Sequence, residues 1–149
     1  SARVPDWKMK IVGDGPERER LLQEIDELGL QDSVSILPFS HELERFYQES
    51  RVFLFCSRFE GFPNVVLEAM SFGLPVVAVR SPGAIADLVQ PGATGELAEL
   101  GDLEDLSDQL VRLMSDESLC RTMSANARQS IERFGRASVL QEWRKVLSW

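Results

Sequence analysis

A short segment of this chain, residues 57–70, combines side chains suited to binding a charged and hydroxyl-rich ligand. It carries two carboxylates, Glu60 and Glu68, with Gly61 directly after the first and Pro63 where a helix is expected to begin. Free backbone amides at a helix start favour an anion such as phosphate, and a glycine lets the backbone approach a ligand closely. Beside a bound phosphate, Glu60 would accept hydrogen bonds from a hydroxyl-rich group and Glu68 from a ribose diol.

The same spacing also fits two solvated charges near the end of a helix, and the spacing alone leaves both interpretations open. Other chemistry has little support in the sequence. The single histidine, His41, cannot complete a Ser/His/Asp or Cys/His set, and no CxxC or HExxH spacing offers zinc ligands. We therefore expect no metal and no cofactor.

Short β-branched runs alternate with stretches of helical periodicity along the chain. This alternation predicts an α/β fold with a doubly wound, Rossmann-like parallel sheet. The run 52–56 is apolar on both faces, which predicts a central strand with a buried Cys56. The run 74–79 is interpreted as another central strand of this kind. Further strands are expected at residues 8–12, 33–37 and 95–98, and the first helix over 17–30.

Ligands of such sheets bind beyond the carboxyl ends of the strands, which selects the turns at residues 13–16, 38–41, 57–64 and 80–84. Three helical stretches close the chain, and their apolar stripes are interpreted as core-facing surfaces rather than cofactor sites. The stripes are Leu103, Leu106, Leu110 and Leu113; Leu119, Met123, Ala127, Ile131 and Phe134; and Val139, Leu140, Trp143, Val146 and Leu147.

The composition is that of an ordinary globular protein, and 149 residues predict one compact domain, residues 1–149. Lys and Arg number 16 against 24 Asp and Glu, a net charge of −8 that argues against nucleic-acid or electrostatic membrane binding. No apolar stretch approaches the roughly 18 residues that span a membrane, and the first residues do not read as a signal peptide. We expect a cytoplasmic protein, with a peripheral position at the inner membrane as an option for a longer form.

Several segments resemble one known family. Residues 60–68 are similar to the E-x7-E signature of retaining GT-B glycosyltransferases of family 4, the glycosyl transferases group 1. The continuation A-M-S-F-G-L-P-V-V-A at residues 69–78 resembles a further segment of that family, as does I-V-G-D-G-P at residues 11–16. Matches in the same order continue through G-A-T-G at 92–95 and N-A-R at 126–128.

The resemblance implies a role for each of these residues. Glu60, the catalytic candidate, would contact the hydroxyls of the donor sugar, and Glu68 those of the ribose. Backbone amides of the loop would lie near the sugar and diphosphate, and the turn after the second strand would pack on the nucleobase. The implied donor-binding residues are Gly61, Phe62, Asn64, Val65, Glu68, Pro38, Phe39 and Gly13.

The resemblance also implies the C-terminal, donor-binding half of a GT-B enzyme. In the family an additional strand and helix, carrying an Arg and a Lys that grip the diphosphate, and an acceptor domain precede this region. Neither Arg58 nor Arg80 matches those cations. Pro38 stands where relatives often have a glycine, and Asp87 where they have a glutamate, so Pro38 removes one amide from the base site.

The implied activity is sugar transfer from a UDP- or GDP-sugar to a glycan or lipid-linked acceptor, in polysaccharide or glycoconjugate biosynthesis. A noncatalytic nucleotide-sugar binding module of the same fold is the alternative, and a sugar-nucleotide 2-epimerase is a third. We expect this fragment alone to be inactive and to self-associate. Its strand at residues 8–12 would lack a neighbour, and its last helix, around Trp143 and Trp149, would pack toward the missing domain.

Overall fold

The computed structural model describes residues 6–147 of the chain, so Trp149 lies outside the described residues. The chain divides into two compact units at residue 46, unit 1 with residues 1–46 and unit 2 with residues 47–149. Each unit is described by itself, and the expectation of a single domain over residues 1–149 stays a prediction.

Unit 1 is one strand–helix–strand element. β1 (Met9–Val12) and β2 (Val34–Leu37) pair in parallel, with Ile11 opposite Ile36, and α1 (Arg18–Glu27) connects them. A parallel pair needs such a crossover, since a tight turn cannot return the chain to the same end of the sheet. All three elements lie within their predicted ranges.

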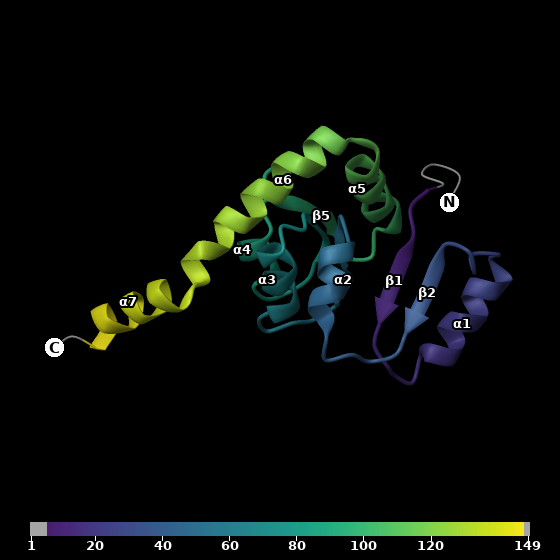
Figure 1. Ribbon diagram of the computed structural model, residues 1–149, viewed down its shortest axis with the longest axis horizontal. Helices are drawn as coiled ribbons and strands as arrows, with labels where there is room; N and C mark the ends of the chain where they lie inside the picture. The colour runs from purple at the N-terminus through teal and green to yellow at the C-terminus, as the bar shows by residue number, and fades with distance from the viewer. Residues whose placement is uncertain (1–5, 148–149) are drawn as a thin grey trace. The chain divides into compact units, whose positions relative to one another are not determined.

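α2 (Leu43–Glu49) crosses the boundary between the units and contributes Tyr47 to unit 2. Unit 2 then contains a parallel sheet in the order β3-β4-β5. Figure 1 shows the order of its helices along the chain. Its elements are β3 (Phe53–Phe55), α3 (Asn64–Ser71), β4 (Val76–Arg80), α4 (Ile85–Leu88), β5 (Gly95–Glu99), α5 (Leu103–Ser115), α6 (Glu117–Ser130), the 3-10 helix η1 (Ile131–Phe134) and α7 (Arg136–Leu147).

The core of unit 2 lies on both faces of β4, because successive side chains of a strand point to opposite faces. One cluster contains Val76 and Ala78 together with Val66 and Met70 of α3 and Ile85 and Leu88 of α4. The other contains Val77 together with Leu113 of α5 and Met123 of α6. Helices on both faces of a parallel sheet confirm the doubly wound α/β class.

Of the two runs interpreted as central strands, residues 74–79 contribute β4, which is central in the sheet of unit 2, whereas β3 lies at the edge of that three-stranded sheet. Two expectations about burial were wrong. Cys56 is exposed instead of buried, because β3 ends at Phe55 and the chain is already leaving the sheet there. The stripe of α7 does not face a core: Trp143 is 57% exposed and Val146 75%.

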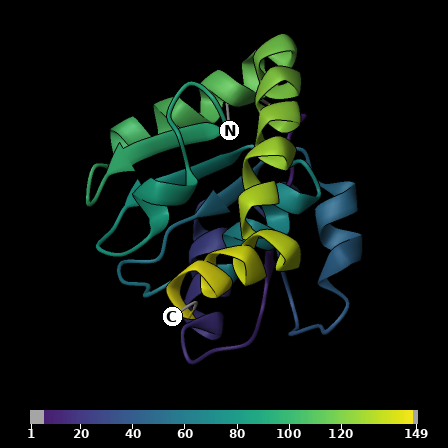
Figure 2. The ribbon, with the colours of Figure 1, turned by 90° about the vertical axis from the view of Figure 1, so that its left-hand side faces the viewer.

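α7 differs from the other long helices of unit 2 in having no buried residue. Figure 2 shows α6 leading into α7 with a change of direction at η1. The exposed apolar residues of α7 agree with the expectation that the last helix leaves apolar surface open to solvent. That another domain would cover this surface stays a prediction. Among the described residues, no helix is long and apolar enough to cross a membrane.

Candidate functional site

The loop from β3 to α3 holds the first predicted carboxylate. The Ser57 hydroxyl donates to the carbonyl of Phe59 at 3.1 Å and to Oε1 of Glu60 at 3.4 Å, and Glu60 is partly buried. Pro63 is the N-cap of α3 with φ −82° and ψ 83°, and no side chain caps this end. The predicted helix start at Pro63-Asn64 is therefore confirmed. The amides of Asn64 and Val66 donate to the carbonyls of Phe62 and Pro63 at 3.0 Å, and no capping side chain blocks the approach of an anion to this helix start.

A second turn supports the backbone of this loop. Gly83, in the turn after β4, has φ +116°, and a Cβ placed there would overlap the carbonyl oxygen of Glu60 and lie 3.4 Å from that of Gly61. Only glycine permits both this conformation and this approach. The turn at residues 80–84 was selected from the sequence, but its contact with Glu60 was not foreseen.

Gly61 lies in open surroundings. No heavy atom lies within 4 Å of the position a Cβ would take there, so nothing within the described protein explains a glycine. The neighbouring Phe62 is exposed at 45% and Val65 at 37%. The loop and the first turn of α3 thus present backbone and apolar side chains at the surface of unit 2.

Glu68 lies on α3, and its side chain is exposed. Its Oε2 accepts a hydrogen bond from the Tyr47 hydroxyl at 3.1 Å. Burial of the phenol, more than the nearby carboxylate, raises the pKa of Tyr47 to about 12. Tyr47 therefore remains a proton donor throughout the neutral range. The sequence analysis assigned no role to Tyr47 and missed this bond.

The remaining predicted residues lie together at the carboxyl ends of the strands of unit 1. The amide of Gly13 donates to the carbonyl of Leu37 at 3.0 Å, and the amide of Phe39 donates to Oδ2 of Asp14 at 2.8 Å. Phe39 is 60% exposed and meets His41 edge to face, with ring centroids 4.8 Å apart. Asp14 holds the turn that follows Pro38, a role that the sequence analysis did not assign.

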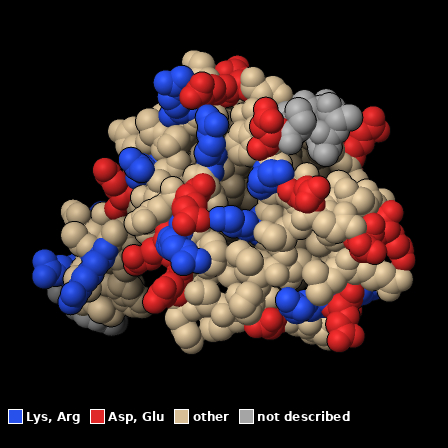
Figure 3. All heavy atoms as spheres, turned by 45° about the vertical axis from the view of Figure 1, so that its right-hand side comes forward, with Lys and Arg blue, Asp and Glu red and all other residues tan. Residues whose placement is uncertain are grey.

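The structure thus gives two groups of predicted residues. Gly13, Pro38 and Phe39 belong to unit 1, whereas Glu60 through Glu68 belong to unit 2. Of the two arginines compared above with the family's cations, Arg80 is paired with Glu99 at 3.0 Å, and Arg58 is exposed. Figure 3 shows that both acidic and basic side chains are exposed at the surface. Within residues 6–147 no group of three His, Cys, Asp or Glu side chains could hold a metal ion.

The doubly wound parallel α/β fold of this chain is that of GT-B glycosyltransferases, and solved neighbours share this fold. HepE of Anabaena, solved in complex with UDP-glucose, matches 97% of this chain and 41% of its own at 28% identity, with a TM-score of 0.85. The C-terminal domain of LpcC, a glycosyl transferase group 1 family protein of Francisella tularensis, matches 86% of this chain and 69% of its own at 25% identity, with a TM-score of 0.78.

The model of the family "Glycosyl transferases group 1" matches residues 1–130, and the chain belongs to this family. Among curated relatives, a glycosyltransferase of Haemophilus influenzae is 34% identical over 145 residues, 97% of this chain. The N-acetyl-alpha-D-glucosaminyl L-malate synthase of Bacillus anthracis is 35% identical over 142 residues, 95% of this chain. The chain spans 41% and 37% of the length of these two relatives. The resemblance inferred from residues 60–68 is confirmed at the level of the family.

Proposed function

We propose that this chain binds the nucleotide-sugar donor of a retaining glycosyltransferase. The complete protein would transfer the sugar from a UDP- or GDP-sugar to a glycan or a lipid-linked acceptor. The observation that carries the proposal is the arrangement at the β3–α3 junction. There Glu60, the open Gly61 and the uncapped start of α3 follow one another, with Glu68 on the helix. A relative named for polysaccharide synthesis, the capsular polysaccharide biosynthesis glycosyltransferase CapM of Staphylococcus aureus at 32% identity, supports the reaction class.

Each group in this arrangement has a chemical task. Glu60 accepts hydrogen bonds from the sugar hydroxyls and orients the ring, while Glu68 does the same for the ribose. When the bond between the sugar and the diphosphate breaks, negative charge grows on the departing diphosphate, and the amides at the start of α3 stabilise it. The donor's own phosphate would assist this departure, so that the protein supplies orientation and electrostatics rather than a nucleophile.

Substitution of the two glutamates tests this division of tasks. Glu68→Ala removes charge-assisted hydrogen bonds worth roughly 1.5–3 kcal/mol, so we expect UDP or GDP to bind about 10- to 100-fold more weakly. Glu60→Ala should leave the nucleotide affinity unchanged and weaken only the nucleotide sugar. Isothermal titration calorimetry with UDP, GDP, UDP-glucose and a GDP-sugar measures both effects, and thermal melting checks the fold.

Glu104→Ala is the matched control, since Glu104 is an exposed glutamate in the first turn of another helix, α5. It should change neither affinity. Equal losses of nucleotide and nucleotide sugar in Glu60→Ala would contradict the separate tasks. Unchanged nucleotide affinity in Glu68→Ala, with unchanged melting, would exclude the ribose role.

We further propose that sugar transfer requires residues of a longer protein, because an acceptor must be held against the donor for the reaction to occur. We also propose that this longer protein acts in the cytoplasm. The chain alone, incubated with UDP- or GDP-sugars and an oligosaccharide acceptor, should release no nucleotide above the hydrolysis background. Sustained release that depends on the acceptor would contradict this. The apolar surface of α7 favours self-association of the isolated chain, which sedimentation velocity would detect as a dimer.

A further inference from the structure

Tyr47 is a buried tyrosine with a closely constrained ring. It is 8% exposed, lies nearly parallel to Phe72 with ring centroids 5.5 Å apart, and meets Phe53 edge to face at 6.0 Å. Phe72 is the residue at the end of α3, and Phe53 is the first residue of β3. The ring is therefore held by the two elements that flank the β3–α3 loop. Its hydroxyl has a defined position, because packing on two sides leaves the ring little freedom.

Glu68, unlike Tyr47, has a flexible side chain. It is an exposed side chain on the surface of α3, and such a glutamate samples many rotamers in water. Its Oε2 accepts the Tyr47 hydroxyl at 3.1 Å, whereas no hydrogen bond to its Oε1 is found among the described residues. One carboxylate oxygen is thus held by Tyr47, and the other, on an exposed side chain, has no hydrogen-bond partner among the described residues.

We propose that Tyr47 is the positioning residue of the nucleotide site, which orders Glu68 so that its second oxygen meets the ribose hydroxyls. This inference rests on the proposed function. The ordering is completed before the ligand arrives, so binding does not have to immobilise the glutamate, and the affinity for nucleotide rises accordingly. Since the phenol titrates only near pH 12, Tyr47 donates to Glu68 at every pH at which a nucleotide sugar would be bound.

Tyr47→Phe tests the proposal, because it keeps both ring contacts and removes only the hydroxyl. We expect UDP, measured by titration calorimetry, to bind about three- to tenfold more weakly, the effect of having to immobilise one flexible side chain on binding. The kinetic origin should be a faster dissociation. In the double variant Tyr47→Phe with Glu68→Ala, the loss of UDP affinity should equal the loss in Glu68→Ala alone, since Tyr47 acts only through Glu68.

Thr122→Ala is the control for the loss of one hydroxyl. Thr122 lies on α6, and its Oγ1 donates to the carbonyl of Ser118 at 3.0 Å, so its removal should leave UDP affinity unchanged. Where titration detects no UDP binding to the wild-type chain, GDP takes its place as the probe.

The outcomes separate the inference from the proposed function. If Glu68→Ala weakens nucleotide binding but Tyr47→Phe only lowers the melting temperature, the hydroxyl is structural and the positioning role is excluded. Additive losses in the double variant would exclude it as well. If Glu68→Ala itself has no effect, or if neither UDP nor GDP binds, the proposed ribose role fails and the inference fails with it.

Discussion

The two units of the chain use the same strand–helix–strand pattern but differ in how completely they bury it. In unit 1 none of residues 6–46 is buried, and β1 and β2 contain only half-buried and exposed positions. In unit 2 the first four residues of both β4 and β5 are buried, with apolar clusters on the two faces of the sheet. Two strands and one helix cannot cover both faces of a sheet, whereas three strands with helices on either side can.

This difference bears on function. The predicted sugar and ribose carboxylates stand on the well-packed unit 2, where neighbouring elements hold each side chain or its backbone. The predicted base-binding residues, Pro38 and Phe39, stand on the loosely packed unit 1. Sites built on rigid elements hold their geometry better than sites on marginal ones. We therefore expect the sugar and ribose contacts to be preorganised to a greater degree than the base contact.

The largest effect that tests this comparison comes from matched core substitutions. Leu113 of α5 is 1% exposed and packs against Val77 and Met123, whereas Leu21 of α1 is half-buried in unit 1. Leu113→Ala should lower the free energy of unfolding by about 2–5 kcal/mol, because the lost contacts leave a cavity. Leu21→Ala should cost about 1 kcal/mol or less. Urea denaturation measures both, and equal losses would show that unit 1 is packed as well as unit 2.

The sequence predicted most of this architecture. The strands β1, β2, β4 and β5 follow from their β-branched runs, and the apolar run 52–56 followed by Pro63 located the β3–α3 junction correctly. The errors concern burial. Cys56 is the last residue of an apolar run, which predicts that it belongs to the strand. Pairing with β4 ends one residue earlier, at Phe55, and the sequence pattern does not show where this pairing ends. The exposure of α7 could not be read from its period, because a helical stripe is the same whether its partner is present or not.

Contacts between residues distant in sequence were also beyond prediction. The bond from Tyr47 to Glu68 joins positions 21 residues apart, and the approach of Gly83 to Glu60 joins two different turns. Each depends on how the sheet brings its loops together. A pattern of residue types predicts which face a side chain takes, but not which side chain it meets there.

Glycine substitutions at the exits of two strands give the next largest effect. Gly83 in unit 2 and Gly13 in unit 1 both have positive φ, +116° and +150°, but only Gly83 lies against other backbone. Both alanine variants pay for the backbone strain, about 1–2 kcal/mol. Gly83→Ala must also displace the loop of Glu60, for a total of roughly 2–4 kcal/mol. It should weaken UDP-glucose binding more than UDP binding. Equal destabilisation of the two variants would mean that the turn after β4 does not support the loop.

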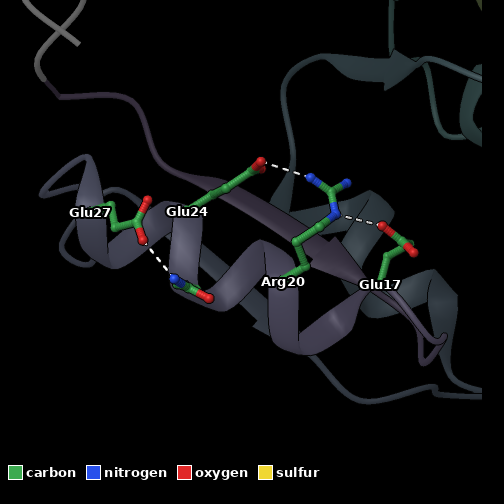
Figure 4. Close-up of polar contacts among 5 residues, drawn as sticks. Glu17, Arg20, Glu24 and Glu27 are labelled. Atoms are coloured by element: carbon green, nitrogen blue, oxygen red, sulfur yellow. Dashed lines mark hydrogen bonds and ion pairs between the residues drawn. The ribbon is translucent and has the colours of Figure 1, made fainter.

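The smallest expected effect comes from removing one ion-paired arginine in each unit. In unit 2, Nη1 of Arg112 lies 2.7 Å from Oε1 of Glu96, which is 4% exposed on β5. In unit 1, Arg20 lies between Glu17 and Glu24 on α1, at 2.6 and 2.7 Å, and all three side chains are exposed (Figure 4). Arg112→Ala leaves a buried carboxylate without its partner, which should destabilise the chain by about 1–3 kcal/mol.

Arg20→Ala removes only solvated contacts, so it should cause no measurable change in stability at ordinary salt concentration. Thermal melting of both variants in low and high salt measures the two changes in stability. The loss in Arg112→Ala should persist in salt because its partner is shielded from counterions. Adding Glu96→Gln to Arg112→Ala should recover part of the lost stability, since the neutral amide is less costly to bury than an unpaired carboxylate. A double variant no more stable than Arg112→Ala would show that the charge of Glu96 is already solvated, and that unit 2 is less tightly packed at β5 than its burial implies.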